Sequence, residues 1–235
     1  SQHSQDPRLA DATACCHEGE VSGRLGLPGW PAVTESAVIA RDAMLARHTS
    51  SRVHVAHVST AEGVDVLRWA KSRGIAITAE VTPHHLALDV DVLRDYDPVH
   101  KVNPPLRPQE DVEALRAALA DGTIDAVATD HAPHARHDKE HAFVDAAFGM
   151  LGLETAFAVV HDVMVRTGRM SLTDLAERMS TAPARIARLA GHGRPIAPGE
   201  PANLVLVDTD ASVTVDRNAS HSLSRNNPWH DRTFT

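Results

Sequence analysis

The sequence predicts an α/β fold in which parallel strands alternate with helices, and three observations support this prediction. The middle of the chain alternates short runs rich in β-branched residues with segments of helical periodicity, in the order β-α-β-α-β. The β-rich runs are apolar nearly throughout, as expected for strands that are covered on both faces. The loops between them are short, which implies parallel strands joined by helical crossovers. A (β/α) barrel and an open doubly wound sheet both fit this pattern.

The first predicted strand of this pattern covers residues 53–58, VHVAHV, and a helix follows it. Ser59 stands three residues before Glu62, which is the spacing of a capping box at a helix N-terminus. The helix is expected to stop at Gly74, because glycine readily adopts the left-handed conformation that ends helices. A second β-rich run, residues 75–81, is the next predicted strand.

The second half of the α/β pattern begins with a helix at Pro108, a position where the missing N–H of proline does no harm. Gly122 is expected to end this helix, and residues 124–129, IDAVAT, form the third predicted strand. Apolar periodicity then predicts further helices at roughly residues 153–167, 171–180 and 182–190.

The chain changes character at about residue 194. Proline and glycine there punctuate a β-rich run, GRPIAPGEPANLVLVDTDASVTV, which predicts the start of a small β domain. The tail that follows, residues 216–235, is polar and shows no clear pattern. We therefore divide the chain into an α/β unit, residues 1–193, and a partial β domain with its tail, residues 194–235.

Composition and charge exclude several classes of protein. A net charge of -8 argues against a nucleic-acid-binding protein, which needs a basic face. No apolar run is long enough to cross a bilayer, and the opening residues SQHSQDP lack the features of a secretory signal. The two cysteines, Cys15 and Cys16, are adjacent and do not staple a fold, which fits a reducing cytoplasm. We therefore expect a cytoplasmic protein with no nucleic-acid or membrane partner.

Three strand ends each carry a potential metal ligand or acid, namely His3, His57 and Asp130. Period-2 alternation places His57 on the same face as Val53 and Val55. In a (β/α) barrel the functional residues lie at the C-terminal ends of the strands. Imidazole and carboxylate groups from different strands can converge there on one zinc ion and leave a position open for water.

Each of these three residues also has a purely structural explanation. A single half-buried histidine is more often a packed residue with satisfied hydrogen bonds, and an aspartate after a strand often caps the next helix. The repetition at three strand ends favours a metal site. Asp130 could ligate a metal and also shuttle a proton, because a nearby cation keeps its carboxylate ionised.

Further candidates lie in the loops after the predicted strands. Asn103 precedes two prolines in KVNPPLRP and is held extended, so its amide could bind a cyclic imide or ureido group, unless the segment is simply a rigid turn. His134 follows a proline in a loop where a histidine can reach a ligand. Glu80, at a strand end, could orient a metal-bound histidine. Residues 136–150 form either a mobile loop over the site or a plain solvated loop.

Taken together, the motifs resemble those of the dihydroorotases, in particular the long, barrel-type bacterial class of the amidohydrolase superfamily. The resemblance is carried by KVNPPLR, AVATDHAPH and GMLGLET in that order and spacing, and VHVAHVST, AEVTPHHL and GEPANLVLVD add to it. It covers roughly residues 3–208. KVNPPLR together with TDHAPH is specific to this family, whereas TDH alone indicates only the superfamily.

The resemblance implies a fold, a cofactor and a set of site residues. The fold would be a distorted (β/α)8 metal-dependent hydrolase barrel, of which only the C-terminal strands and helices are present, with part of a small β-sandwich domain. Two zinc ions would occupy each site, with His3 and His57 binding the more buried ion. Asp130 would bind the other ion and act as the catalytic general acid and base.

The resemblance also implies how the substrate is held. Asn103 and His134 would contact the dihydroorotate ring, and the backbone around Phe148 and Gly149 would hold its edge. The reaction would be the reversible hydrolysis of L-dihydroorotate to N-carbamoyl-L-aspartate in de novo pyrimidine (UMP) biosynthesis. Two positions depart from the family pattern: Gln5 stands where an acidic residue is frequent, and Phe148 where proline is frequent.

Family members carry further ligands upstream, namely an H-x-H pair, an arginine, and a bridging carboxylate or carboxylated lysine, and none of these is in the sequence. Three strand ends do not close a barrel of eight strands and would leave strand edges exposed. We therefore expect this stretch alone to be inactive and prone to aggregate.

Two rival readings of the sequence stay open. The first is another cyclic amidase on the same scaffold, an allantoinase or a hydantoinase. The second is a catalytically inactive dihydroorotase-like partner of aspartate transcarbamoylase, against which the survival of His3, His57 and Asp130 argues. The expected partners are the small-molecule substrate and either a second copy of the chain or aspartate transcarbamoylase.

Overall fold

A parallel sheet lies at the centre of the protein, which we describe from a computed structural model of residues 1–235. Every strand runs parallel to its neighbour, and the register places His3 opposite Ala56, Val55 opposite Ala79, and Val81 opposite Val127. In spatial order the strands are β1 (Gln2–His3), β4 (Val53–Ala56), β5 (Ile77–Val81) and β6 (Ala126–Val127). The carboxyl ends of all four strands therefore meet at one edge of the sheet.

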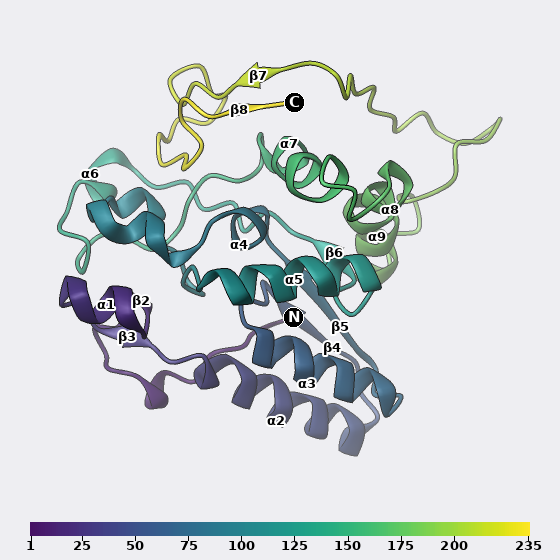
Figure 1. Ribbon diagram of the computed structural model, residues 1–235. Coiled ribbons are helices and arrows are strands. Elements are labelled where there is room, and N and C mark those ends of the chain that lie inside the picture. The colour runs from purple at the N-terminus through teal and green to yellow at the C-terminus, as the bar shows by residue number, and fades with distance from the viewer.

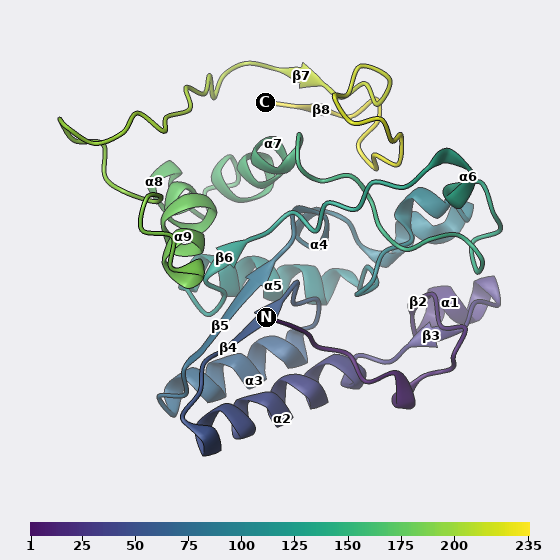
Figure 2. The same ribbon diagram turned by 180° about the vertical axis from the view of Figure 1, so that it is seen from behind.

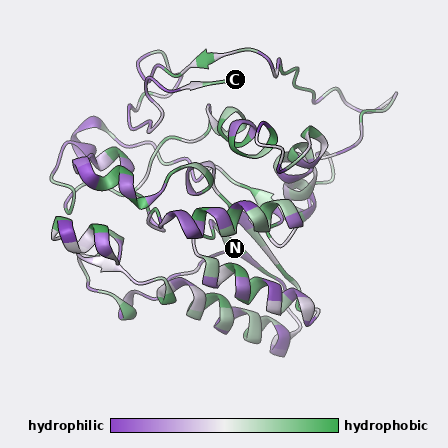
Figure 3. Cartoon of the chain, viewed as in Figure 1, coloured by the Kyte–Doolittle hydropathy of each residue, from purple (hydrophilic) through white to green (hydrophobic).

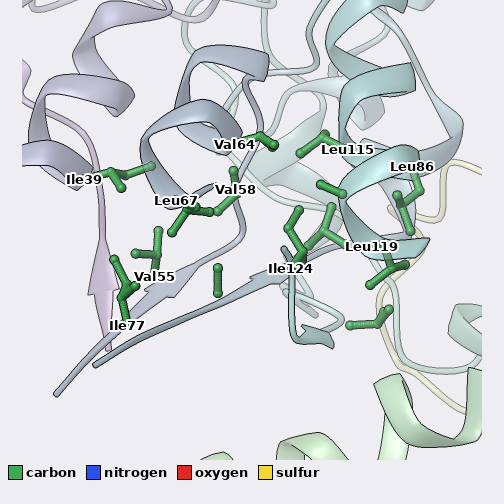
Figure 4. Packing of buried hydrophobic residues seen from close by; sticks show 14 of the residues in the cluster. Ile39, Val55, Val58, Val64, Leu67, Ile77, Leu86, Leu115, Leu119 and Ile124 are labelled. Carbon is green, nitrogen blue, oxygen red and sulfur yellow. The ribbon is translucent and has the colours of Figure 1, made fainter. Parts of the chain in front are cut away.

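Long helices cover one face of this sheet, as Figure 1 shows. They are α2 (Val33–Thr49), α3 (Ala61–Ser72) and α5 (Gln109–Asp121). Side chains from the strands and from these helices interdigitate in a buried core, part of which is drawn in Figure 4. Figure 3 shows the matching pattern on these helices, where hydrophobic and hydrophilic residues alternate. Burial of this apolar surface is the main force that holds the helical layer on the sheet.

The opposite face of the sheet borders a hollow of about 640 Å³. Figure 2 shows the strands from this side, with α9 (Ala182–Ala187) beside β6. Alternation along the strands decides which side chains face the hollow, so that its lining includes His54, Thr78, Glu80 and Ala128. The α/β class predicted from the sequence is confirmed, and the sheet is an open arc of a barrel rather than a closed one.

Several predicted elements are present with shifted ends. The helix predicted after Ser59 is α3, but Thr60 caps it, because the Thr60 hydroxyl oxygen accepts from the Gly63 N–H. The helix predicted at Pro108 is α5, and Gly122 ends it in the left-handed conformation. The helix predicted at 182–190 is α9, which ends at Ala187.

The predicted helices at 153–167 and 171–180 each change from α to a wider π geometry along their length. They are α7 (Ala156–Val160) followed by His161–Val165, and α8 (Leu172–Ala176) followed by Glu177–Thr181. The other helices and short strands are α1 (Glu20–Leu25), α4 (Pro83–Ala87), α6 (Arg136–Lys139), β2 (Cys16–His17) and β3 (Gly29–Trp30), with short 3-10 turns at Pro7–Leu9, Val90–Asp95 and Pro98–His100. None of the helices has the length and apolar character that a membrane crossing requires.

The C-terminal segment from about residue 194 runs over the top of the molecule in Figure 1. Residues 194–212 contain no strand, and Leu206 within the predicted β-rich run is fully exposed. Strands β7 (Val213–Thr214) and β8 (Thr233–Phe234) then form an antiparallel pair. Trp229 and Phe234 pack into a second buried cluster with Met150, so the tail is anchored to the α/β unit. The proposed division at residue 194 stays a prediction.

Candidate active site at the carboxyl ends of the strands

The first two predicted metal ligands lie in direct contact. Because β1 pairs with β4 so that His3 lies opposite Ala56, the next residue, His57, comes beside His3. The distance from His3 Nδ1 to His57 Nε2 is 3.0 Å, and the two ring centroids are 4.6 Å apart. Two imidazoles from distant parts of the chain are therefore gathered at one point of the sheet edge.

Hydrogen bonds at His3 indicate which nitrogen atoms are free. His3 Nε2 lies 3.0 Å from Gln5 Oε1, an atom that only accepts, so this ring nitrogen donates to it. His3 Nδ1 then accepts from His57 Nε2, which leaves the lone pair of His57 Nδ1 without a partner. Gln5, which stands where the family often has an acidic residue, still supplies an acceptor to His3.

The environment of His57 favours its neutral form. Burial lowers the pKa of His57, and the neighbouring His3 lowers it further, while the Asp130 carboxylate acts in the opposite direction. A neutral imidazole with a free nitrogen is the form that binds a metal ion. The buried, unpartnered Nδ1 atom of His57 thus fits a site for a cation.

The backbone at two of the predicted ligands is left-handed. His57 has a φ of 36° and Asp130 a φ of 46°, values that residues other than glycine seldom adopt. Strand β4 ends at Ala56, so alternation from Val53 and Val55 does not set the direction of the His57 side chain. Conformations of this kind persist where the surrounding structure holds them, and they cluster at functional sites.

Asp130 is half-buried just beyond β6, at the same edge of the sheet as the histidine pair. Its charge reaches His57, as the effect on the His57 pKa shows. The three predicted ligands do not form one compact cluster, however, because no group of three or more His, Cys, Asp or Glu side chains is arranged to hold a metal ion. The structure thus gathers His3 and His57 into a pair and leaves Asp130 nearby.

Asn103, the first predicted substrate contact, lies next to the histidine pair. Its Nδ2 atom is 3.4 Å from His3 Nε2, and its Oδ1 atom is buried without a hydrogen-bond partner. His85 braces the same loop, because its Nε2 donates to the Pro104 carbonyl oxygen at 3.0 Å. A buried amide oxygen that lacks a donor is suited to receive one from a ligand.

His134, Phe148 and Gly149, the other predicted substrate contacts, lie together. His134 Nε2 donates to the Phe148 carbonyl oxygen at 2.7 Å. Gly149 has a φ of 126°, and a Cβ added there would come within 2.5 Å of the Ala132 Cβ and 3.0 Å of His134 Nε2. Only glycine fits this position, so its backbone approaches the His134 loop closely.

A buried carboxylate supports the turn after His57, and the sequence analysis did not identify it. Glu35, on α2, accepts hydrogen bonds from the backbone N–H and the hydroxyl group of both Ser59 and Thr60. Arg107, which is almost completely buried, donates through Nε to the Ser59 hydroxyl at 3.1 Å. Its burial lowers the Arg107 pKa, whereas the Glu35 charge raises it. Of these two residues, only Arg107 could have been identified from the sequence, because it belongs to the KVNPPLR motif.

Glu80 does not have the predicted role beside a metal-bound histidine. Its Oε2 atom pairs with His54 Nε2 at 3.0 Å, inside the hollow of the sheet. His54 Nδ1 in turn lies 2.8 Å from the Thr78 hydroxyl. Side chains alternate along β5, so Val81 faces the helices and Glu80 faces the hollow. Glu80 therefore contacts His54 and not His57.

Comparisons with known proteins identify the relatives of this chain. The chain is 57% identical over 232 residues to a dihydroorotase of Streptomyces coelicolor, covering 99% of the chain and 54% of the relative. It is 55% identical over 234 residues to a dihydroorotase of Mycobacterium tuberculosis, covering 100% of the chain and 54% of the relative. The resemblance to dihydroorotases is thereby confirmed, and the chain spans about half the length of the curated relatives it matches.

Solved structures and family models extend the comparison. An L-hydantoinase from Arthrobacter aurescens superposes with a TM-score of 0.82 at 32% identity, covering 88% of this chain and 46% of that one. A D-hydantoinase from Thermus sp. gives a TM-score of 0.80 at 26% identity, covering 93% and 52%. A model described as "Dihydro-orotase-like" matches residues 1–63, and one described as "Amidohydrolase family" matches residues 35–234. Because the amidohydrolase model matches most of this chain, the chain belongs to the amidohydrolase family.

Proposed function

We propose that this chain is part of a dihydroorotase, which interconverts L-dihydroorotate and N-carbamoyl-L-aspartate. The observation that carries the proposal is the 54–57% identity to dihydroorotases over nearly the whole chain. The hydantoinase structures match the fold at only 22–32% identity. The loops that carry Asn103, His134 and Gly149 lie within the region that matches the dihydroorotases at this higher identity. The dihydroorotase match therefore favours dihydroorotate over hydantoins as the substrate.

A divalent metal is part of the proposal, because the amidohydrolase family is generally metal-dependent. We propose zinc, with two ions per site, held in this chain by His3 and His57 and by Asp130. Zinc, when bound, would lower the pKa of a water molecule and polarise the ring carbonyl group. The neutral imidazole of His57 and its unpartnered Nδ1 atom support this role.

The residues of this chain would divide the chemistry among them. In the hydrolytic direction the amide bond of the ring breaks, its carbon gains the hydroxyl group of water, and its nitrogen gains a proton. Asp130 would take the proton from the attacking water and deliver it to the leaving nitrogen. Asn103 would bind the ring through its free Oδ1 atom, and the His134 loop would hold the ring edge.

A substrate panel tests the proposed function. The full gene product, loaded with zinc, would be assayed with dihydroorotate, hydantoin, dihydrouracil and allantoin. The proposal expects ring opening of dihydroorotate at a kcat/KM at least about 100-fold above the other three. A preference for hydantoin or allantoin would replace it with the rival cyclic amidase, and metal-loaded protein that opens none of the rings would favour the inactive partner of aspartate transcarbamoylase.

The cellular setting belongs to the same proposal. Cys15 and Cys16 are both buried and free, which is consistent with the cytoplasmic location expected from their pattern. A second copy of the chain or aspartate transcarbamoylase is the protein partner that we propose. Sedimentation of the purified gene product, alone and with aspartate transcarbamoylase, measures both associations.

A further inference from the structure

One residue of the C-terminal tail reaches the loops proposed to hold the substrate. Asn226 is buried, and its Nδ2 group donates to the carbonyl oxygens of Ala132 at 2.8 Å and Gly149 at 3.2 Å. Its Oδ1 atom accepts from the His134 N–H at 3.4 Å. Its backbone carbonyl oxygen accepts from the Leu151 N–H at 2.9 Å. The Asn226 side-chain amide and its backbone carbonyl oxygen therefore bond two segments, residues 131–134 and 149–151.

Little regular structure joins these two segments, although His134 Nε2 bonds the Phe148 carbonyl oxygen, and His131 Nδ1 accepts from the Gly152 and Leu153 N–H groups at 3.2 Å. The two segments share a single isolated bridge, between His131 and Met150, and the Ala132 N–H donates to the Met150 carbonyl oxygen at 3.0 Å. Asn226 adds bonds on both sides of that bridge, to His134 and to Gly149. It therefore adds the bonds of a third segment to those that set the separation of the two proposed substrate contacts.

The Gly149 carbonyl oxygen receives a second donor, the Lys139 ammonium group. Lys139 Nζ donates to it at 3.0 Å and to the Ala147 carbonyl oxygen at 2.7 Å. The Gly149 N–H donates to the Lys101 carbonyl oxygen at 2.8 Å. The Gly149 N–H and carbonyl oxygen are thus both bonded, and Asn226 is the contribution of the tail.

The tail is anchored next to Asn226 by a separate contact. The Glu154 carboxylate accepts from the Ser220 hydroxyl at 2.6 Å and from the backbone N–H groups of His221 and Ser222 at 3.2 Å. Trp229 and Phe234 are buried on the other side of Asn226. The chain is therefore fixed on both sides of this residue, which keeps the Asn226 amide in place.

From this geometry we propose that Asn226 is a positioning residue that sets the relative placement of His134 and Gly149. The inference rests on the proposed function, since those residues are the proposed substrate contacts. Asn226 touches no reacting atom and acts only through the two loops. Loosening the loops weakens substrate binding more than the chemical step, because the proton-transfer group, Asp130, precedes the crosslinked residues.

The neighbouring asparagine offers a matched control. Asn227 is also buried, but its Oδ1 atom accepts from the Trp229 N–H at 2.9 Å, a bond that a carboxylate can also make. Asn226→Asp removes both donors and directs a carboxylate at two carbonyl oxygens. Asn227→Asp buries the same new group and keeps its acceptor. The milder variant Asn226→Ser replaces the two amide donors with one hydroxyl on a shorter side chain, which does not span to both carbonyl oxygens, and it adds no charge.

The experiment compares these variants in the full gene product. We expect Asn226→Asp and Asn226→Ser to raise KM for dihydroorotate about 10-fold or more, with kcat within about 3-fold, and Asn227→Asp to change neither. Hydrogen exchange of the backbone amides in residues 147–153 should accelerate in both Asn226 variants and stay unchanged in Asn227→Asp. If Asn226→Asp does not fold, Asn226→Ser decides.

Two results would overturn the inference. One is equal kinetic and exchange changes in the Asn226 and Asn227 variants, which would indicate general destabilisation. The other is a raised KM with unchanged exchange in residues 147–153. The exchange measurement needs no substrate, so it separates this inference from the proposed function. If the wild-type protein opens hydantoin in place of dihydroorotate, the proposed function fails and KM for hydantoin decides the inference.

Discussion

His3 Nδ1 and His57 Nε2 lie 3.0 Å apart, although 54 positions separate the two residues in the chain. The contact follows from strand pairing, since β1 and β4 run parallel with His3 opposite Ala56. In this arrangement His57 Nδ1 is available to an ion, and His3 Nδ1 becomes available once it releases the bond from His57. The pair is therefore the part of the candidate site on which metal binding is most directly tested.

Replacing either histidine of the pair should reduce metal content. His3→Ala and His57→Ala each remove one proposed ligand. We expect the affinity for zinc to fall by at least about 10-fold, so that less zinc remains bound after dialysis. Elemental analysis of the dialysed gene product measures this. His54→Ala is the control, because His54 lies on β4, three residues before His57, but bonds Glu80 and Thr78 inside the hollow. Equal zinc content in all three variants would refute the assignment of the pair as ligands.

Loss of the Asp130 carboxylate should slow turnover strongly. Asp130→Asn preserves size but cannot accept or deliver the proton, so we expect kcat to fall by more than about 100-fold. Steady-state assays with dihydroorotate check this. Asp125→Asn serves for comparison, since Asp125 lies just before β6, pairs with Lys71 at 2.8 Å and lies away from the site. Near-normal turnover in Asp130→Asn would exclude its acid and base role.

The close approach of Gly149 to the His134 loop predicts a steric effect. Gly149→Ala places a Cβ 2.5 Å from the Ala132 Cβ in a backbone conformation that alanine seldom adopts, so the loops must separate. We expect kcat/KM to fall by roughly 10- to 100-fold. Gly168→Ala also has a positive φ but no atom within 4 Å of the new Cβ, and should leave kcat/KM unchanged. Similar losses in both variants would point to backbone strain alone.

The Glu35 carboxylate should contribute substantially to stability. Glu35→Gln loses acceptor capacity for the N–H and hydroxyl groups of Ser59 and Thr60, all of them buried. We expect the free energy of unfolding to fall by roughly 3 kcal/mol, measured by urea denaturation. Glu110→Gln, at an exposed position at the start of α5, should change it little. A change below that of Glu110→Gln would contradict the supporting role of Glu35.

Burial of His85 should make the fold sensitive to acid. Burial lowers the pKa of His85 from its ordinary 6.5 to about 3, so the unfolded chain gains a proton below pH 6.5 that the folded chain refuses until about pH 3. The free energy of unfolding should therefore fall as the pH drops from 6.5 toward 3. His85→Gln should reduce this slope in urea titrations at several pH values, and exposed His48→Gln should not. An unchanged slope in His85→Gln would show that other groups control the acid response.

The periodic parts of the fold could be predicted from the sequence, and the missed parts share a physical cause. Helices α3 and α5 have clear stops at Gly74 and Gly122, and both were expected. Helix α2, which has 17 residues, was not predicted, because its buried side includes Thr34 and Glu35 as well as apolar residues. Polar residues that find partners in another segment break the apolar pattern on which such a prediction rests.

The candidate site was predictable only in part for a similar reason. Strand ends identified His3 and His57 as neighbours, since parallel strands end at one edge. Glu35 bonds Ser59, which lies 24 positions away in the chain. Asn226 bonds Gly149, which lies 77 positions away. Nothing in the local sequence marks such long-range hydrogen bonds, because they depend on how the loops are packed.

The left-handed backbone at His57 and Asp130 narrows the residues that natural variation can place there. Glycine accepts such a conformation freely and asparagine or aspartate tolerate it, whereas valine, isoleucine and threonine do not. A descendant that abandons catalysis but keeps the fold is therefore expected to drift toward glycine or asparagine at these two positions. Glycine or asparagine at positions 57 and 130 would indicate a relative that has lost the activity but kept this backbone conformation. Valine, isoleucine or threonine there would indicate that the backbone conformation itself has changed.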